Sequence, residues 1–577
     1  MSPKKHDSRA QLIGCAPGSR DKHLVFTLYN FIINHPERSK LAIHLLLLLV
    51  ISIMGTIFSI FLASILLFHL ILSAGGCRRR RNSPPSPANA LPFLGHLHLL
   101  KKPLHRSLAA LSAAHGPVIS LRLGSRPVLL VSSAAAAVEC FTKNDAAFAN
   151  RPRFLAGKHL GYNYTTLLWA SNGPHWRDLR RIVSAEIFSS SRINSFAGFR
   201  LQEVAAMTKA LADDSGADGD HHKPVELRPR LFNLTLNVIM RMAAGKSESP
   251  DRLMWSRRYH EIVKESFAVS GASNIVDYLP VLRWIDYQGM EKKLVKLQEK
   301  RDAFLQELLD ERRKEWVAEG CREHEEEEEE EEEEAAANRW KCLIDVMLSL
   351  QQRDPTKYPD DVIKGLIVIM LSAGTETSAL TVEWAMALLL SNPSSLARAQ
   401  AELYRRVGHG RLVRESDLPN LPYLNSIIRE TLRLHPVTPI MPAHESGEDC
   451  VVSGFLVPKG TLLLANAWAI HRDPALWPEP EAFSPERWEL EGELGSRKVA
   501  MRKTMAFGMG RRGCPGEGMA LRLVGLALGA LVQCFEWDVH GGKDIDLTEG
   551  TGLSMPMVAP LRTSFRRRPF VTDAFFP

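Results

Sequence analysis

FGMGRRGCPG, residues 507–516, places Cys514 among glycines, after two arginines and directly before a proline. Buried structural cysteines usually have apolar neighbours, whereas this one has positive charge and little side-chain bulk around it. Positive charge favours the ionised thiolate over the neutral thiol. The stretch therefore predicts a chemically active sulfur at Cys514, and we expect that sulfur to be ionised.

The remaining cysteines form no recognisable motif. No pair has the two-residue gap of zinc or redox sites, which argues against a disulfide scaffold and for a reducing compartment. They are Cys15, Cys77, Cys140, Cys321, Cys342, Cys450 and Cys534.

The composition is that of a globular protein with a large core. The chain has 577 residues, 45% of them hydrophobic, and a net charge of +7 that includes a run of ten glutamates, Glu325–Glu334. The rest of the chain is therefore clearly basic. The basic residues are scattered and no nucleic-acid-binding module is recognisable, so we expect a membrane surface or an acidic partner and no nucleic acid.

The N-terminal part contains a candidate membrane anchor. Residues 41–72 are 32 positions without Asp, Glu, Lys or Arg, and about 20 apolar residues are enough to span a bilayer. A basic and Pro-rich neck over 73–90 follows and contains Arg78–Arg81. Because positive charge favours the cytosolic side, this predicts a single-pass helix with the body in the cytosol. A cleaved signal peptide does not fit the length or the flanks. Residues 1–40 are expected to be a poorly ordered extension.

Several elements can be placed from local patterns. Residues 118–133 predict a β-hairpin around Gly124 and Ser125, and 171–189 predict a helix that starts after Pro174. Residues 285–316 and 421–436 are typical of amphipathic helices. The segment 321–338, which contains the glutamate run, predicts a solvated acidic loop insertion, because ten like charges repel one another.

Residues 360–393 form a long apolar pattern interrupted at its centre by Gly374–Thr377. A helix that is apolar on all faces belongs in a core, and a carboxylate at its midpoint makes a membrane span costly. The small and polar residues fit either a cavity beside the helix or a close helix–helix contact. We expect the hydroxyls to bond to carbonyls four residues earlier and to loosen the helix there.

A further polar group is predicted around Glu430. Glu430 and Arg433 lie three residues apart on one helix face, and Arg487 in FSPERW, residues 483–488, could join them. Buried, such a triad would fix geometry more than it would add stability.

In this order, WRDLR (176–180), AGTETS (373–378), ETLR (430–433), PERW (485–488) and FGMGRRGCPG resemble the signature of the cytochromes P450. The resemblance extends from about residue 90 to the end, and AHESGEDC (443–450) and NAWAIHRDP (466–474) are similar to the plant A-type, isoflavone-hydroxylase-like group. It implies a mainly α fold with small β-sheets, with residues 91–577 as the catalytic domain.

The resemblance also assigns site residues. Cys514 would be the thiolate ligand of the iron of heme b, iron protoporphyrin IX, with Phe507 and Gly516 beside it and Arg512 on a heme propionate. Trp176, Arg180 and His444 are the other expected heme contacts, although a lone loop histidine is more often solvated. Thr377 would hydrogen-bond bound dioxygen, and Glu376 would relay protons from solvent. Glu430, Arg433 and Arg487 would be structural.

The implied function is a monooxygenase anchored in the endoplasmic reticulum membrane. Electrons from NADPH would come through NADPH-cytochrome P450 reductase, which would dock on the basic face near Arg177, Arg502, Lys503 and Arg511. The expected substrate is a small hydrophobic or aromatic plant metabolite or xenobiotic, with a weak indication of flavonoid or isoflavonoid hydroxylation. Expected pocket walls are 155–170, the middle of 360–390, 437–441 and 553–557.

Two other classes remain open from the sequence. One is an isomerase or dehydratase of the same fold that does not activate O2, and such relatives lose the acid–threonine pair that AGTETS keeps. The other is a non-catalytic membrane scaffold. Intact motifs at every position argue against it.

Overall fold

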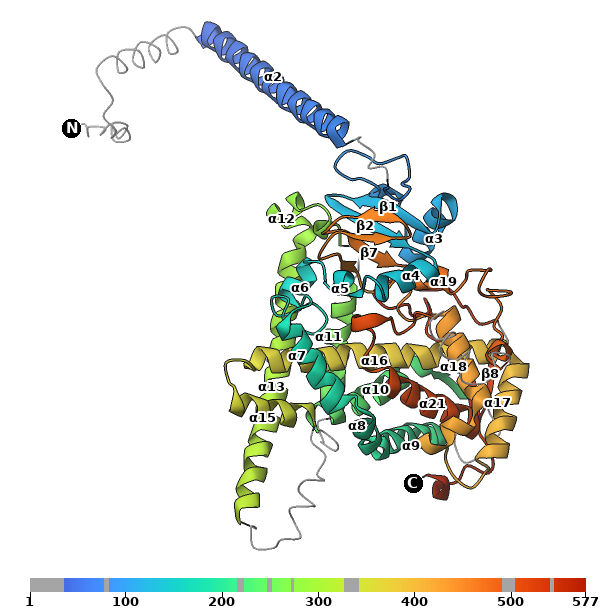
Figure 1. The fold of residues 1–577 in the computed structure, drawn as a ribbon. Helices are drawn as coiled ribbons and strands as arrows, with labels where there is room; N and C mark the ends of the chain where they lie inside the picture. The colour runs from blue at the N-terminus through green and yellow to red at the C-terminus, as the bar shows by residue number, and fades with distance from the viewer. Residues whose placement is uncertain are drawn as a thin grey trace, which may run out of the picture. The chain divides into compact units, whose positions relative to one another are not determined.

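The computed structural model describes residues 36–76, 82–214, 223–245, 252–270, 274–325, 342–489, 504–539 and 544–576. The chain forms two compact units, residues 1–81 and 82–577. The first unit consists, in its described part, of helix α2, and the second contains all the predicted site residues (Figure 1).

Helix α2, Pro36–Gly76, is longer at both ends than the predicted span 41–72. Its residues 47–65 are long and apolar enough to cross a membrane and are not buried. Residues 36–40, expected to belong to a poorly ordered extension, are helical. The rest of that extension and residues 77–81 of the neck lie outside the described residues.

Two other helices, α16 and α21, match a membrane span by length and composition only. Their apolar windows are 67% and 72% buried inside the protein, so both are core helices of the second unit. This agrees with the expectation that residues 360–393 are not a second span.

The second unit is mainly helical. Its helices are α3 Leu104–His115, α4 Ala134–Phe141, α5 Asp145–Phe148, α6 Leu155–His159, α7 Pro174–Ile182, α8 Ser190–Ser195, α9 Ala197–Asp214, α10 Leu227–Ala244, α11 Arg252–Ser270, α12 Val281–Trp284, α13 Met290–Glu325, α15 Leu343–Arg353, α16 Asp360–Ser391, α17 Pro393–Arg406, α18 Pro422–Leu434, α19 Ala467–Ile470 and α21 Glu517–Cys534.

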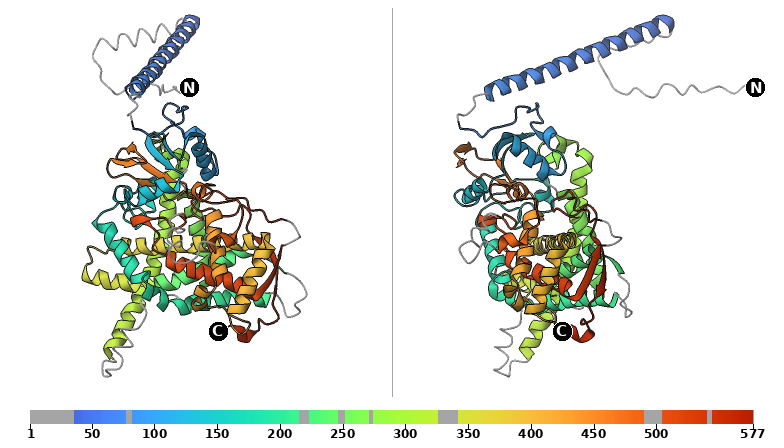
Figure 2. Two further views of the ribbon diagram at one scale, coloured as in Figure 1. Left: turned by 45° about the vertical axis from the view of Figure 1, so that its right-hand side comes forward. Right: turned by 90° about the vertical axis from the view of Figure 1, so that its right-hand side faces the viewer.

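Helix α16 runs through the centre of this unit. In the right-hand view of Figure 2 it is seen end-on, with other helices around it. It packs against α10, α21 and α18, and its residues 378–390 are buried, Trp384 completely. Neighbours on most sides thus explain why the helix is apolar on nearly all faces.

Three small sheets complete the fold. The predicted hairpin is confirmed, because β1, Val118–Leu123, pairs antiparallel with β2, Arg126–Val131. β2 then pairs in parallel with β7, which joins segments more than 300 residues apart, and β4 pairs with β7. The other strands are β3 Lys223–Glu226, β4 His444–Glu445, β5 Cys450–Val452, β6 Phe455–Val457, β7 Leu462–Ala465, β8 Phe535–Val539 and β9 Arg562–Arg567.

Two predicted elements have different bounds in the structure. The helix expected over 171–189 is α7, which gives way to a wider π-helical turn at Val183–Ile187. Helix α13 extends to Glu325, so residues 321–325 are helical and do not belong to a loop. The glutamate run beyond them lies outside the described residues.

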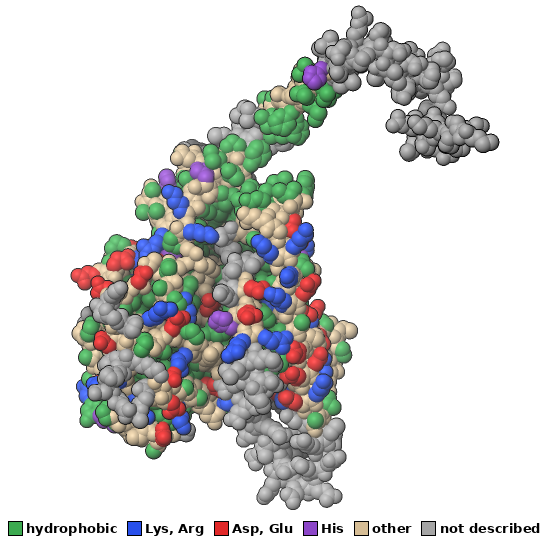
Figure 3. Space-filling view, turned by 180° about the vertical axis from the view of Figure 1, so that it is seen from behind, with side chains coloured by type: hydrophobic (Ala, Val, Ile, Leu, Met, Phe, Trp, Pro, Cys, Tyr) green, Lys and Arg blue, Asp and Glu red, His purple; other side chains and the backbone are tan. Residues whose placement is uncertain are grey.

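The surface shows mixed charge on the face drawn in Figure 3. Basic and acidic side chains alternate over this face without a continuous basic stripe.

Candidate active site

The segment around Cys514 is a tight loop that leads into α21. Cys514 N–H donates to the Phe507 carbonyl at 2.8 Å, and α21 begins three residues after the cysteine. Gly510 has a φ of +66°, and a Cβ there would lie 2.4 Å from Asp145 Oδ1 and 2.5 Å from the Phe141 carbonyl oxygen. Only glycine therefore fits at this position, which explains part of the glycine pattern.

The charge state predicted for Cys514 is wrong for the bare side chain. Burial raises the pKa of the thiol, while the N–H groups of Gly516 and Glu517 and the charge of Arg180 act in the opposite direction and do not overcome it. Yet the residue is exposed, so the sulfur is accessible although protein surrounds it closely. A metal ion bound there would remove the thiol proton, because only the thiolate is a metal ligand.

A cluster of cationic side chains accompanies this loop. Arg512 donates to the carbonyls of Ala149, at 2.9 Å, and of Leu167, at 3.1 Å, and also to Ala170. Its guanidinium stacks over the Trp176 ring at 4.1 Å. Burial, together with the neighbouring Arg151 and Arg180, lowers the pKa of Arg512 to about 9.

Arg151 is the residue of this cluster that the sequence did not reveal. It is buried and donates to the Pro442 carbonyl at 2.6 Å and the Ala443 carbonyl at 2.9 Å, and burial lowers its pKa to about 10. The available sequence signal was an arginine directly after the apolar stretch AAFAN, residues 146–150. Among the described residues, none of Arg151, Arg180 and Arg512 forms an ion pair with a carboxylate.

His444 and Trp176 lie here too, but not as solvated or free groups. His444 is buried on β4, with Nδ1 2.7 Å from the Phe148 carbonyl oxygen. Burial and then the charge of Arg151 hold its pKa well below the usual value, so the ring is neutral. The Trp176 N–H donates to the Leu167 carbonyl at 3.1 Å. His444 is therefore not a solvated loop histidine, which was the alternative to a heme contact.

This arrangement fits a cofactor such as heme. Arg151 is buried and Arg180 and Arg512 are half-buried. Guanidinium groups withdrawn from water without carboxylate partners are costly, and two propionates would neutralise most of their charge. The accessible thiol of Cys514 beside them would provide the iron ligand. The residues predicted to hold the group are Trp176, Arg180, His444, Phe507, Arg512, Cys514 and Gly516, and Arg151 would join them.

The midpoint of α16 fits both interpretations left open by the sequence, a close helix–helix contact and a cavity beside the helix. A Cβ at Gly374 would lie 2.7 Å from Ile239 Cδ1 of α10, so a close helix–helix contact needs glycine there. Ala373 and Thr377 are four residues apart and therefore lie on one face of the helix, which is not the face of Gly374. Ala373 is exposed there, although it lies in the middle of a core helix. Thr377 Oγ1 donates to the Ala373 carbonyl at 2.5 Å. The expected back-bond is present, and the helix remains continuous.

Glu376 has an altered pKa. Burial raises the pKa to about 7, against the opposing influence of Ser554 and Arg228. Its Oε2 atom is buried and has no hydrogen-bond partner among the described residues. A carboxyl group with this pKa exchanges a proton readily near neutral pH.

A cavity of about 370 Å³ begins at Glu376. All four predicted wall segments contribute to it, with Leu168 and Trp169 from the first, Glu376 from the second, Ile440 from the third and Leu553 from the fourth. The sequence did not predict two further walls, Lys102–His105 and residues 550–552, because only long-range packing brings them here. The lining is mainly apolar, which suits a small hydrophobic ligand.

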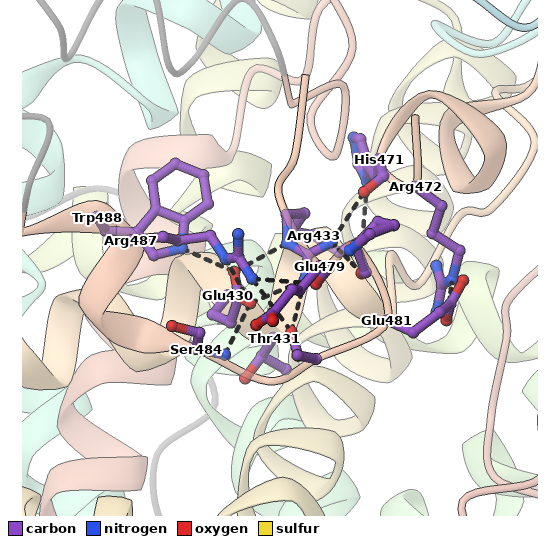
Figure 4. A network of polar contacts seen from close by, with 12 residues as sticks. Glu430, Thr431, Arg433, His471, Arg472, Glu479, Glu481, Ser484, Arg487 and Trp488 are labelled. Atoms are coloured by element: carbon purple, nitrogen blue, oxygen red, sulfur yellow. Dashed lines mark hydrogen bonds and ion pairs between the residues drawn. The ribbon is translucent and has the colours of Figure 1, made fainter. Parts of the chain in front are cut away.

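The predicted Glu430 group is confirmed (Figure 4). The Glu430 carboxylate accepts hydrogen bonds from Arg433 Nε at 2.9 Å, Arg487 Nε at 2.9 Å and Trp488 Nε1 at 2.9 Å. The Glu430 and Arg433 side chains are completely buried. Arg433 also donates to the carbonyls of His471, Pro480 and Ala482, so this group ties α18 to the segment 471–488.

Comparison with known proteins gives a consistent result. The Cytochrome P450 family model matches residues 84–561. The chain is 48% identical to Cytochrome P450 81Q32 of Catharanthus roseus, over 89% of this chain and 97% of the relative. It is 43% identical to an isoflavone 2'-hydroxylase of Glycyrrhiza echinata (89% and 97%) and 44% identical to an isoflavone 3'-hydroxylase of Medicago truncatula (86% and 95%).

Proposed function

Because this chain belongs to the cytochrome P450 family and is one of its monooxygenases, we propose that it hydroxylates a flat aromatic plant metabolite of the isoflavonoid kind on a ring carbon. The observation that carries the proposal is the cavity of about 370 Å³, whose mainly apolar lining includes Glu376. Two of the relatives are named for hydroxylation of an isoflavone at different ring positions. Nothing in the comparisons favours an isomerase, a dehydratase or a scaffold.

The cofactor is proposed to be heme b, held by Cys514 and by the neighbouring arginines. Bound heme supplies the activation of O2 with electrons that arrive one at a time. The chain provides the sulfur ligand, charge neutralisation by Arg151, Arg180 and Arg512, and apolar walls that keep the reacting carbon away from water.

Glu376 and Thr377 are proposed to manage the protons of the reaction. Consecutive helical residues point about 100° apart, so Glu376 can face the cavity while Thr377 faces the side on which Ala373 is exposed. Glu376 can both hold and release a proton near neutral pH, because burial raises its pKa to about 7. The Thr377 hydroxyl now bonds to Ala373 and can turn to a ligand beside it.

Replacing Glu376 by Gln is expected to reduce product formed per NADPH consumed by about a hundredfold. In the native enzyme this ratio should fall as pH rises through about 7, because Glu376 then loses the proton that it donates. The Gln variant should show no such pH dependence. The measurement is product and NADPH quantified together from pH 6 to 8, with Thr377→Ala as a second variant that should also be uncoupled; native coupling in both would contradict the assignment.

The membrane and the electron donor are the proposed partners. Helix α2 would anchor the chain in the endoplasmic reticulum membrane. Exposed apolar side chains also occur in the second unit, on α12 and after it (Val281, Trp284, Ile285) and shortly after the neck (Leu91, Phe93). NADPH-cytochrome P450 reductase would dock near Arg177 and Arg511, and the salt dependence of turnover tests this. Arg502 and Lys503 lie outside the described residues.

The proposed activity can be tested directly. We expect purified protein, with reductase and NADPH, to add one oxygen atom to at least one simple isoflavone, as measured by mass spectrometry. The carbon-monoxide difference spectrum of the reduced protein should contain the Soret band for which the family is named. A protein with this band that oxidises no isoflavone, while it oxidises another class in a plant extract, would overturn the substrate class alone.

A further inference from the structure

One buried carboxylate connects two walls of the substrate cavity. Glu549 lies at the base of a turn in which Gly550 N–H donates to the Pro556 carbonyl at 2.7 Å and Val558 N–H donates to the Thr548 carbonyl at 2.9 Å. Residues 550–554 of this turn line the cavity. The Glu549 side chain is only 1% exposed, so its charge needs partners within the protein.

Donors from two other segments meet this carboxylate. Oε2 accepts from His105 Nε2 at 2.9 Å and from Arg106 Nε at 2.8 Å, both at the start of α3. Oε1 accepts from Trp468 Nε1 of α19 at 2.8 Å. Helix α3, helix α19 and the turn are thereby held by a single side chain.

Other charged groups face the same carboxylate. Arg472 Nη2 lies 3.8 Å from Oε1 and His435 Nδ1 lies 3.6 Å from it, which is too far for a hydrogen bond. The His435 ring stacks on Trp384 of α16. Burial alone would raise the pKa of Glu549, but its donors, His105 foremost, outweigh burial and hold that pKa well below the usual value. Glu549 therefore remains ionised across the physiological pH range.

The two walls concerned belong to one cavity lining. Lys102–His105 form one of them, and His105 itself bonds to Glu549. Gly550–Ser554 form the other, and they begin at the next residue after Glu549. The separation of these walls is fixed through the carboxylate, because apolar contacts alone would tolerate small shifts.

We propose that Glu549 is a positioning residue that sets the distance between these walls and so selects which ring carbon of an aromatic substrate is hydroxylated. The inference rests on the proposed function for its substrate class. A displacement of about 1 Å can change a rate by about a hundredfold, so a small change in wall separation is enough to redirect hydroxylation.

The test uses Glu549→Gln, which keeps the size and removes the charge. With 7-hydroxyisoflavone as substrate, we expect the ratio of ring-hydroxylated products to shift by about tenfold and the reduced carbon-monoxide spectrum to remain native. Glu549→Asp keeps the charge and should restore part of the native ratio. The matched control is Glu415→Gln, which breaks the pair with the fully buried Arg200 away from the cavity and should leave the ratio unchanged.

Two further measurements keep the outcome decisive. If Glu549→Gln does not fold, Trp468→Phe removes one donor and should shift the product ratio in the same direction. If the native enzyme oxidises no isoflavone, binding of phenylimidazole and of the longer biphenylylimidazole reports cavity width, read as absorption changes of the loaded protein. The proposal would be overturned if the folded Glu549→Gln variant kept the native product ratio, or the native relative affinities for these two probes. This holds even where the proposed substrate class is correct.

Discussion

Replacing Cys514 by serine is expected to abolish product formation and the carbon-monoxide Soret band together. A serine hydroxyl is a far weaker donor to iron and stays protonated at neutral pH, whereas a metal removes the proton from the Cys514 thiol despite the burial that raises its pKa. The measurements are heme content, the reduced difference spectrum and turnover with reductase and NADPH.

The matched control for this variant is Cys450→Ser. Cys450 is half-buried on β5 and takes no part in the cationic cluster. We expect it to keep the native spectrum and native turnover. A Cys514→Ser protein with native pigment and turnover would contradict the assignment of the sulfur, and with it the whole interpretation of the site.

Replacing Glu430 by glutamine is expected to remove most of the folded, heme-loaded protein. The carboxylate has five donors, which include the Ser484 N–H, and Arg433 beside it is completely buried. An uncompensated buried guanidinium costs about 3–5 kcal/mol, a large part of the roughly 5–15 kcal/mol that stabilises a typical domain. The soluble yield, the heme content and the midpoint of thermal unfolding measure this loss.

Arg398→Gln provides the comparison for Glu430→Gln. Arg398 pairs with Glu486 and Glu489 close to the same segment, but its side chain is 45% exposed. Exposed pairs contribute about 1 kcal/mol or less, so this variant should fold normally. Equal stability of the two variants would show that Glu430 is not the structural centre that its contacts indicate.

Motifs with short-range geometry were predictable from the sequence. The hairpin at 118–133, the core helix over 360–391 and the Glu430–Arg433 pair follow from residue spacing and from a few positions with special backbone needs. The glycines before Cys514 are another case, because Gly510 has no room for a side chain. For such features local chemistry is enough to restrict the structure.

Features created by long-range packing were not predictable. Arg151 joins Arg512 because its position is set by carbonyls of residues 442 and 443, nearly 300 positions later. The contact between His105 and Glu549 spans 444 positions. The pKa of Cys514 depends on how closely the folded protein surrounds the sulfur, which no neighbouring residue in the sequence reveals. Helix ends, as at Gly76 and Glu325, were also misplaced, since composition changes there only gradually.

The cavity is assembled from chain segments that are mostly separate from those that hold the cofactor. Of the side chains assigned to heme binding or proton transfer, only Arg151 and Glu376 also line it. Mutations after gene duplication can therefore alter the remaining lining without touching the machinery of oxidation. One ancestral scaffold can in this way give rise to many enzymes that share a reaction and differ in the compound that they modify.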